Sequence, residues 1–133
     1  MFEKMTFVID IDGTLCPIKQ SNERYEDLIP YIEMVERIRY YKANGAKIVF
    51  YTSRNMNSYQ GSIGLINAHT AKIILDWLEK WEIPYDEIIY GKPWPGHNGF
   101  YVDDRAVRPD EFLKYCPDEL KKLCDNSRVG KGD

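Results

Sequence analysis

Apolar runs alternate with amphipathic helical stretches along this chain, and the alternation limits the fold more than any other feature of the sequence. The patterns predict four strands, the first two of them buried, over residues 5–11, 46–52, 87–91 and 99–104. Helices are predicted over 30–45, which ends at Asn44-Gly45, and over 67–81, which ends before Pro84. Because such alternation implies parallel strands with right-handed crossovers, we expect an α/β fold with a doubly wound, Rossmann-like, mostly parallel sheet and helices on both faces.

Length and charge limit the domain count and the partners. The 133 residues fit one domain over 1–133, with a tail near 121–133 that we expect to be flexible. A formal net charge of −3 argues against nucleic acid or an anionic membrane as a partner. The first apolar run is broken by Asp10 and is too short for a signal peptide, and no run approaches a membrane span. We therefore expect a small anionic ligand.

The cysteines indicate the compartment. Cys16, Cys116 and Cys124 are odd in number and lack the CxxC spacing of zinc sites and redox motifs. A disulfide framework is therefore not expected, and a reducing cytoplasm is the simplest location. Cys16 follows closely after Asp10 and Asp12, where we interpret it as a small packing residue rather than a redox-sensitive thiol.

Polar and charged side chains follow each predicted strand. Asp10 and Asp12 project to the same side because side chains alternate along a strand, and two such carboxylates repel each other unless a cation or a proton intervenes. The later strands are followed by a comparable polar set: Thr52, Ser53, Arg54, Lys92, Asp103 and Asp104. In a parallel α/β sheet, ligands bind at the carboxyl ends of the strands. This set suits a hard cation together with a phosphoryl group.

Four motifs in order carry a resemblance to a known superfamily. DIDGT at 10–14, YTSR at 51–54, GKP at 91–93 and YVDDR at 101–105 resemble the haloacid dehalogenase superfamily of aspartate-nucleophile phosphatases. Within it, the stretches after YTSR and around GKP are similar to a small bacterial family associated with capsular or surface-polysaccharide biosynthesis. The resemblance spans roughly residues 5 to 112.

The resemblance implies a role for each motif residue. Asp10 is expected to be the nucleophile that becomes a phosphoaspartate, and Asp12 the general acid and base. Thr52 is expected to donate a hydrogen bond to the phosphoryl group, and Lys92 to neutralise its charge. Magnesium is expected to bind the Asp10 carboxylate and the main-chain carbonyl of Asp12. The motif-four aspartates complete the expected set, with Asp103 as a direct ligand and Asp104 as a direct or water-mediated one.

Substrate contacts are predicted from residues that follow the strands. The predicted substrate-binding residues are Thr52, Ser53, Arg54, His69, Lys92, His97 and Arg105. Arg54 and His69 are the first choices for substrate contacts beyond the phosphate site. Each also has a structural alternative: Arg54 could pair with a motif-four carboxylate, and His69 could lie in the first turn of its helix. The intervals between motifs leave no room for a cap domain, so the substrate is bulky, or a second copy of the chain or the loop 53–66 closes over a small one.

Three functions from different classes fit these residues. The favoured one is a magnesium-dependent phosphatase acting on a small sugar, polyol, hydroxy-acid or three-carbon phosphate in surface-polysaccharide precursor biosynthesis. A phosphotransferase or mutase would need an acceptor-binding cap. A signalling receiver domain also places acidic residues, a Thr and a Lys on a doubly wound sheet, but it needs no general acid two residues after its phosphorylated aspartate. Asp12 therefore favours the hydrolase.

Overall fold

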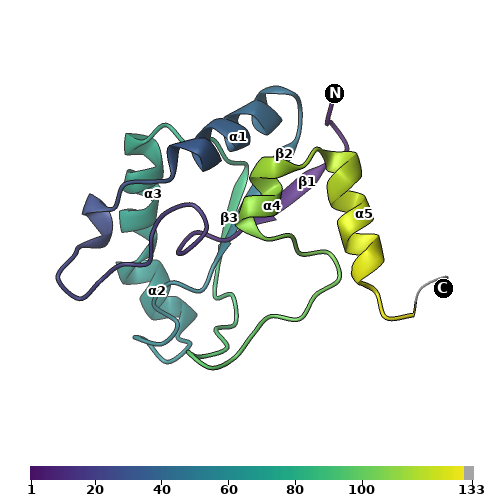
Figure 1. Cartoon of the computed structure of the whole chain (residues 1–133). Helices are drawn as coiled ribbons and strands as arrows, with labels where there is room; N and C mark the ends of the chain where they lie inside the picture. The colour runs from purple at the N-terminus through teal and green to yellow at the C-terminus, as the bar shows by residue number, and fades with distance from the viewer. Residues whose placement is uncertain (131–133) are drawn as a thin grey trace. The chain divides into compact units, whose positions relative to one another are not determined.

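A three-stranded parallel sheet forms the centre of the first part of the chain (Figure 1). This computed structural model describes residues 1–130, which fall into two compact units, 1–94 and 95–130. The strands are β1 (Thr6–Ile9), β2 (Lys47–Thr52) and β3 (Glu87–Tyr90). β2 lies in the middle and pairs in parallel with both neighbours, Val8 opposite Val49 and Thr52 opposite Tyr90. The predictions of a parallel α/β sheet and of the first three strands are confirmed.

Helices connect the strands of the first unit. α1 (Ile32–Ala43) follows β1, and α2 (Ile63–His69) and α3 (Ala71–Lys80) follow β2, with a short 3-10 helix η1 (Tyr25–Asp27) before α1. The strand order β1-β2-β3 advances in one direction, so right-handed crossovers place these helices on the same face of the sheet. The reversal of strand order that defines a doubly wound sheet is not present among the strands formed by residues 1–130.

The core of the first unit lies between β2 and its helices. Ile48 and Phe50 of β2 are fully buried, as are Ile38 of α1 and Ile74 and Leu78 of α3. β2 is a continuous apolar run because it is the central strand, whereas β1 is buried only in part. Val8 of β1 is 62% exposed and Thr6 is exposed as well, so the prediction of a buried strand over 5–11 is wrong for these two residues.

Two predicted elements differ from the observed ones in type or bounds. Residues 99–104 form no strand but an irregular segment that ends in a turn, although their apolar residues suit a strand. The helix predicted over 67–81 begins earlier, at Ile63, and is divided at Thr70, whose buried hydroxyl donates to Asn55 Oδ1 at 2.7 Å. The predicted lid loop 53–66 is therefore shorter, because its last four residues already belong to α2.

The second unit contains two helices that the periodicity analysis did not predict. α4 (Pro109–Lys114) and α5 (Pro117–Ser127) each begin with proline. The third residue of each helix is a glutamate whose side chain accepts a hydrogen bond from the backbone N–H of the N-cap residue. Residues 121–127 of the predicted flexible tail belong to α5, and 131–133 lie outside the described residues. The prediction of one domain over 1–133 stays a prediction.

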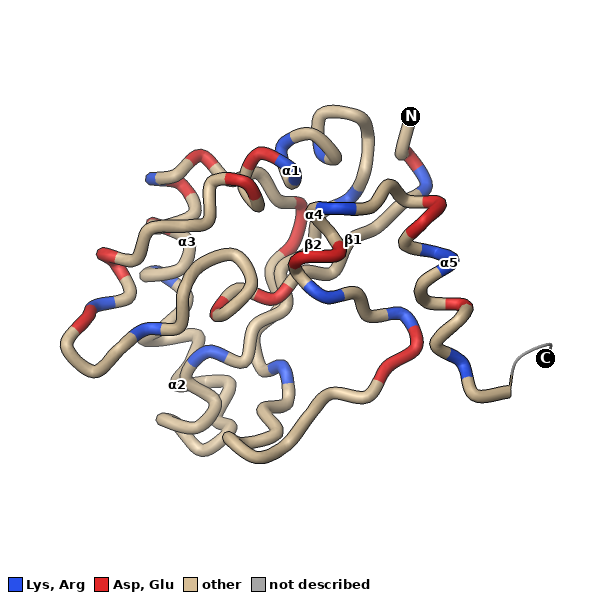
Figure 2. Tube along the Cα trace, in the orientation of Figure 1, with Lys and Arg blue, Asp and Glu red and all other residues tan. Residues whose placement is uncertain are grey.

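Charges are interspersed along most of the chain, with two exceptions (Figure 2). Figure 2 shows uncharged stretches after β2 and after β3, which correspond to residues 55–71 and 93–102 of the sequence. No helix within residues 1–130 combines the length and the apolar character that a membrane span requires.

Candidate active site

The first unit gathers its polar motif residues at the carboxyl ends of the three strands. β1 ends at Ile9 and leads into Asp10 and Asp12, β2 ends at Thr52, and β3 leads into Lys92. The Lys92 backbone N–H donates to the Thr52 carbonyl at 3.0 Å, which joins the ends of β2 and β3. The prediction that these residues meet at one edge of the sheet is confirmed for this unit.

A tight turn holds the two aspartates in place. Ile11 is fully buried between them, and its carbonyl accepts from the backbone N–H groups of Thr14 at 3.1 Å and Leu15 at 2.8 Å. Gly13 has a φ of +85°, a conformation that residues with a Cβ rarely adopt. The turn therefore anchors Ile11 in the core and leaves the Asp10 and Asp12 side chains partly exposed.

Asp10 lies beside a cation and a hydroxyl. Its Oδ1 is 3.8 Å from Lys92 Nζ, and its Oδ2 accepts from Thr14 Oγ1 at 3.3 Å. Burial raises the pKa of Asp10 above its ordinary value and the Asp12 charge adds to this, while Lys92, a backbone hydrogen bond at Ile11 and the Thr14 hydroxyl act in the opposite direction. A carboxylate whose charge is disfavoured in this way is suited to bind a cation or to react as a nucleophile.

Asp12 is paired with an arginine from the end of β2. Arg54 Nε donates to Asp12 Oδ2 at 3.0 Å, and a terminal guanidinium nitrogen donates to Asp12 Oδ1 at 2.9 Å. The Arg54 side chain is only 2% exposed, against 24% for Asp12. Arg54 was predicted as a substrate contact with a motif-four carboxylate as the alternative partner, and the carboxylate that it binds is that of Asp12.

Thr52 is buried at the end of β2. It is 1% exposed, and its Oγ accepts from the Arg54 backbone N–H at 3.1 Å. Accepting this bond uses a lone pair of the hydroxyl and not its proton, so Thr52 retains the capacity to donate to a ligand. Ser53 is half-buried next to it, and its carbonyl accepts from the Met56 backbone N–H at 3.0 Å.

Glycine is required before Lys92. Gly91 has a φ of +84°, and a Cβ added there would collide with Ile63 Cδ1 at the start of α2. The Lys92 side chain is 20% exposed, and its Nζ lies 6.0 Å from the centre of the Tyr51 ring as well as near Asp10. The backbone at Gly91 thus directs the lysine from the end of β3 toward Asp10.

The remaining predicted site residues belong to the end of α2 or to the second unit. His69 is exposed at the end of α2 and packs against the Tyr59 ring with a centroid separation of 5.9 Å. Four others belong to the second unit and are exposed: His97, Asp103, Asp104 and Arg105. Asp103 Oδ1 accepts from the Arg105 backbone N–H at 2.7 Å, and Asp104 accepts from Arg128 Nε at 2.8 Å. Within residues 1–130, no three His, Cys, Asp or Glu side chains form a group arranged to hold a metal ion.

Two site residues were missed by the sequence analysis. Thr14, which bonds Asp10, stands in the DIDGT motif, and its hydroxyl two residues after Asp12 was an available signal. Tyr25, whose ring centre lies 4.1 Å from the Arg54 guanidinium carbon, stands in a stretch without periodicity, where no pattern indicates a contact with Arg54.

Cys16 is a packing residue with an inert thiol. It is fully buried, and its Sγ lies 3.8 Å from Asp12 Oδ1 and 3.9 Å from the Ile11 carbonyl. Burial, reinforced by the Asp12 charge, raises the pKa of Cys16 to about 12. Within residues 1–130 all three cysteines are free.

Alkylation of the native protein is expected to distinguish the thiols. Iodoacetamide should modify the exposed Cys116 and leave Cys16 unmodified until the protein is unfolded, because only a thiolate reacts and Cys16 stays protonated. Peptide mass spectrometry of native and unfolded samples measures this. Modification of Cys16 at the rate of Cys116 in the folded protein would contradict the packing role.

The fold and the sequence similarity together place the chain in a family. The first unit is a small α/β fold with a parallel, Rossmann-like sheet whose carboxyl edge carries acidic, hydroxyl and basic side chains. The chain belongs to the same family as a Vibrio cholerae protein known from its crystal structure: the two are 44% identical, the similarity covers 93% of this chain and 99% of that one, and the TM-score is 0.86. No family model and no curated protein matches the chain.

Weaker structural similarities extend to chains of larger assemblies. A chain of a Pnkp1/Rnl/Hen1 complex is 19% identical over 85% of this chain and 34% of that one, with a TM-score of 0.48. A chain of the Pnkp1/Rnl/Hen1 RNA repair complex is 16% identical over 96% and 32%, with a TM-score of 0.48. Similarities at this level indicate neither a function nor a partner.

Proposed function

We propose that the protein is a magnesium-dependent phosphatase of the haloacid dehalogenase type that hydrolyses a small phosphate monoester through a phosphoaspartate on Asp10. The observation that carries the proposal is the meeting of Asp10 with Lys92 at 3.8 Å, together with a buried Thr52 at the end of the neighbouring strand and a second aspartate two residues after Asp10. A nucleophile, a cation, a hydrogen-bond donor and a proton carrier are the groups that phosphoryl transfer requires.

Each residue has one task in the proposed reaction. An Asp10 oxygen attacks phosphorus, the bond from phosphorus to the ester oxygen breaks, and Asp12 protonates that leaving oxygen. Asp12 then takes a proton from the water that hydrolyses the acyl phosphate, which restores the Asp10 carboxylate and releases inorganic phosphate. Lys92 and Thr52 hold the charged oxygens of the transferring group.

The donors proposed for magnesium are oxygen atoms. The Asp10 carboxylate and the main-chain carbonyl of Asp12 are hard ligands that suit this cation, and the half-buried position of Asp10 is one where a cation would relieve an unfavourable charge. The motif alone supplies Asp103 as a further ligand and Asp104 as a direct or water-mediated one. Bound magnesium would offset the repulsion between an anionic nucleophile and an anionic ester.

A sugar or polyol phosphate is the proposed substrate class, with a hydroxy-acid or three-carbon phosphate as the neighbouring possibility. Residues 55–71, which follow Arg54, contain no Asp, Glu, Lys or Arg but many Asn, Ser, Thr and Tyr side chains (Figure 2). Such side chains bind hydroxyl groups by neutral hydrogen bonds. A role in surface-polysaccharide precursor biosynthesis follows from the resemblance, and the free thiols suit the cytoplasm.

A substrate screen tests this function. Purified protein with magnesium is expected to release inorganic phosphate from at least one member of a panel of phosphorylated sugars, polyols, hydroxy acids and three-carbon compounds. Removing the metal with EDTA should abolish the release and added magnesium should restore it. No release from any ester, with or without the metal, would contradict the proposal.

Loss of the Thr52 hydroxyl is expected to lower turnover strongly. Thr52→Val keeps the shape of the side chain but removes the proposed donor to phosphate, and loss of one such donor costs roughly 100-fold to 1000-fold in kcat. It also removes the acceptor of the Arg54 N–H, at a cost of about 1–3 kcal/mol in the free energy of unfolding. Steady-state kinetics and thermal unfolding measure the two effects separately.

Thr52→Ser is the matched control because it keeps the hydroxyl. This variant is expected to retain turnover within about tenfold of the wild-type protein. If Thr52→Val keeps wild-type turnover, the hydroxyl has no role in the chemistry and its assignment is wrong.

A further inference from the structure

The guanidinium of Arg54 forms an ion pair with the Asp12 carboxylate. Two of its nitrogens donate to the two carboxylate oxygens at 3.0 and 2.9 Å, the paired geometry that fixes the orientation of a carboxylate. Such a contact restricts both rotatable bonds of the Asp12 side chain. Because the Arg54 side chain is 2% exposed, the pair is screened little by water on the arginine side.

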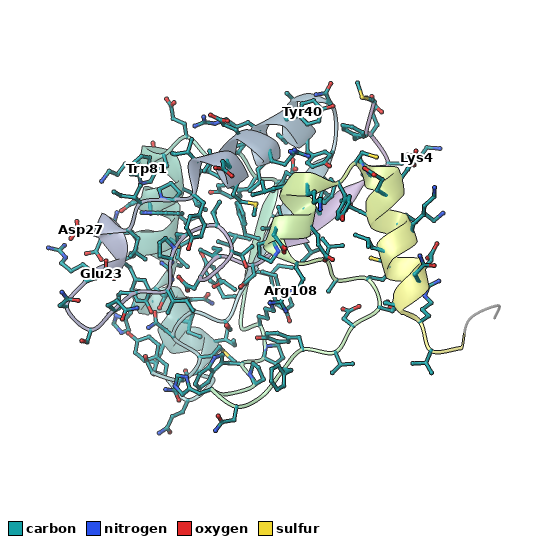
Figure 3. All side chains as sticks on the ribbon, in the orientation of Figure 1. Lys4, Glu23, Asp27, Tyr40, Trp81 and Arg108 are labelled. Atoms are coloured by element: carbon teal, nitrogen blue, oxygen red, sulfur yellow. The ribbon has the colours of Figure 1, made fainter. Side chains whose placement is uncertain are left out.

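Tyr25 covers the guanidinium on one face. Its ring centre is 4.1 Å from the Arg54 guanidinium carbon, within the range of cation–π contacts. The position of Tyr25 is fixed by its neighbour Leu28, whose side chain is buried and whose carbonyl accepts from Trp77 Nε1 of α3 at 2.7 Å. The charged neighbours Glu23 and Asp27 point outward at the edge of the first unit (Figure 3). Tyr25 thus limits the movement of Arg54 away from Asp12.

The backbone of Arg54 connects the pair to the proposed phosphate site. Its N–H donates to Thr52 Oγ at 3.1 Å, and the Thr52 carbonyl accepts from the Lys92 N–H at 3.0 Å. One residue therefore contacts Asp12 through its side chain and Thr52 through its backbone. A shift of Arg54 would move the proposed proton carrier relative to the phosphoryl group.

We propose that Arg54 is a positioning residue that acts through Asp12, held in place by Tyr25, and that it is not a ligand of the substrate. This inference rests on the proposed function and adds to it the group that aims the general acid. An arginine that binds a substrate anion must present its paired donors to the cleft, whereas those of Arg54 face a carboxylate of the protein. Each Asp12 oxygen keeps a further lone-pair direction, so the pairing leaves room for proton exchange with the leaving group.

Leaving-group dependence distinguishes this role from substrate binding and from a general structural role. Phenyl phosphate has a poor leaving group that needs protonation, whereas 4-nitrophenyl phosphate has a good one that needs little. In Arg54→Lys, which cannot form the paired contact, the first-turnover rate of phenol release should fall about 100-fold and that of nitrophenolate release less than about tenfold, because only this step depends on the leaving group. The substrate concentration that gives half of the maximal first-turnover rate should stay within about threefold for both esters, because no substrate contact is lost.

Matched variants separate the effect from a loss of folding. Arg39→Lys removes an arginine on α1 that donates to the Trp81 and Glu82 carbonyls, and it should change neither rate. Tyr25→Leu removes the stacked ring without removing a buried charge, and it should show the Arg54→Lys pattern at smaller size. Tyr25→Phe keeps the ring and should recover most of the rate that Tyr25→Leu loses on phenyl phosphate.

Each other outcome overturns the inference for a different reason. A raised half-saturating substrate concentration with an unchanged ratio of the two first-turnover rates would make Arg54 a substrate ligand. Equal loss of the two first-turnover rates in Arg54→Lys and in Tyr25→Leu would leave only a structural role. A wild-type protein that hydrolyses neither these esters nor any of the screened phosphates would overturn the proposed function itself, and the inference with it.

Discussion

Asp10→Asn is expected to release no measurable phosphate from any ester that the wild-type protein hydrolyses, a loss of at least about 10,000-fold in kcat. An amide is a far weaker nucleophile than a carboxylate and forms no acyl phosphate, so the covalent route is closed. The substitution changes one atom and keeps the shape of the side chain. Phosphate release under saturating substrate and magnesium measures the effect.

The thermal stability of the Asp10→Asn variant shows whether its loss of activity is due to unfolding. The pKa of Asp10 is higher in the folded state than in the unfolded state. Between these two pKa values the folded state binds more protons, so the free energy of unfolding falls as the pH rises through this range. Removing the charge is therefore expected to leave the melting temperature at neutral pH equal or higher. Asp76→Asn, on the exposed face of α3, is a matched change that should keep full activity. An active, folded Asp10→Asn protein would refute the nucleophile assignment.

Asp12→Asn is expected to stop the reaction after the first chemical step. With 4-nitrophenyl phosphate, the good leaving group departs without an acid, but the water that attacks the phosphoaspartate loses its base. One equivalent of nitrophenolate per protein should appear in a burst, followed by turnover about 100-fold to 10,000-fold below the wild-type rate. Rapid-quench kinetics measure the burst and the slow phase.

The Asp12→Asn variant is also expected to be less stable, because Asp12 pairs with Arg54. An asparagine can accept from one Arg54 donor through its oxygen but turns its NH2 group toward the other, which costs about 1–3 kcal/mol in the free energy of unfolding. Thermal unfolding should therefore show a lowered but cooperative transition. Wild-type turnover in a folded Asp12→Asn protein would show that Asp12 moves no proton.

The parts of the fold that could be predicted from the sequence are those with a clear apolar pattern or a clear signal for the end of a helix. β2 is a continuous apolar run between polar ends, and α1 ends at Asn44-Gly45, where Gly45 has a φ of +100°. The starts of α4 and α5 were also predictable, because Pro109 and Pro117 are each followed by Asp-Glu, the signature of a helix N-terminus. The periodicity predicted neither helix, and α4 is only six residues long.

Tertiary contacts decided the features that were not predicted. At Thr70, where α2 and α3 are divided, the hydroxyl bonds Asn55, fifteen residues away. The Tyr25 contact with Arg54 depends on how an irregular segment is fixed by Trp77. At the candidate site, the motif residues Asp10, Thr52 and Lys92 were found from their places after strands, but the partner of Arg54 required the folded chain.

Locating the phosphoryl group on the protein tests whether Asp10 is the nucleophile. Asp12→Asn protein is mixed with magnesium and 4-nitrophenyl phosphate, quenched in acid and digested, and the peptides are mapped by mass spectrometry. We expect one phosphoryl group on the peptide that contains Asp10, its removal by hydroxylamine as befits an acyl phosphate, and none in the Asp10→Asn/Asp12→Asn double variant. A phosphoryl group on another residue, or a protein that hydrolyses the ester without becoming phosphorylated, would contradict the account.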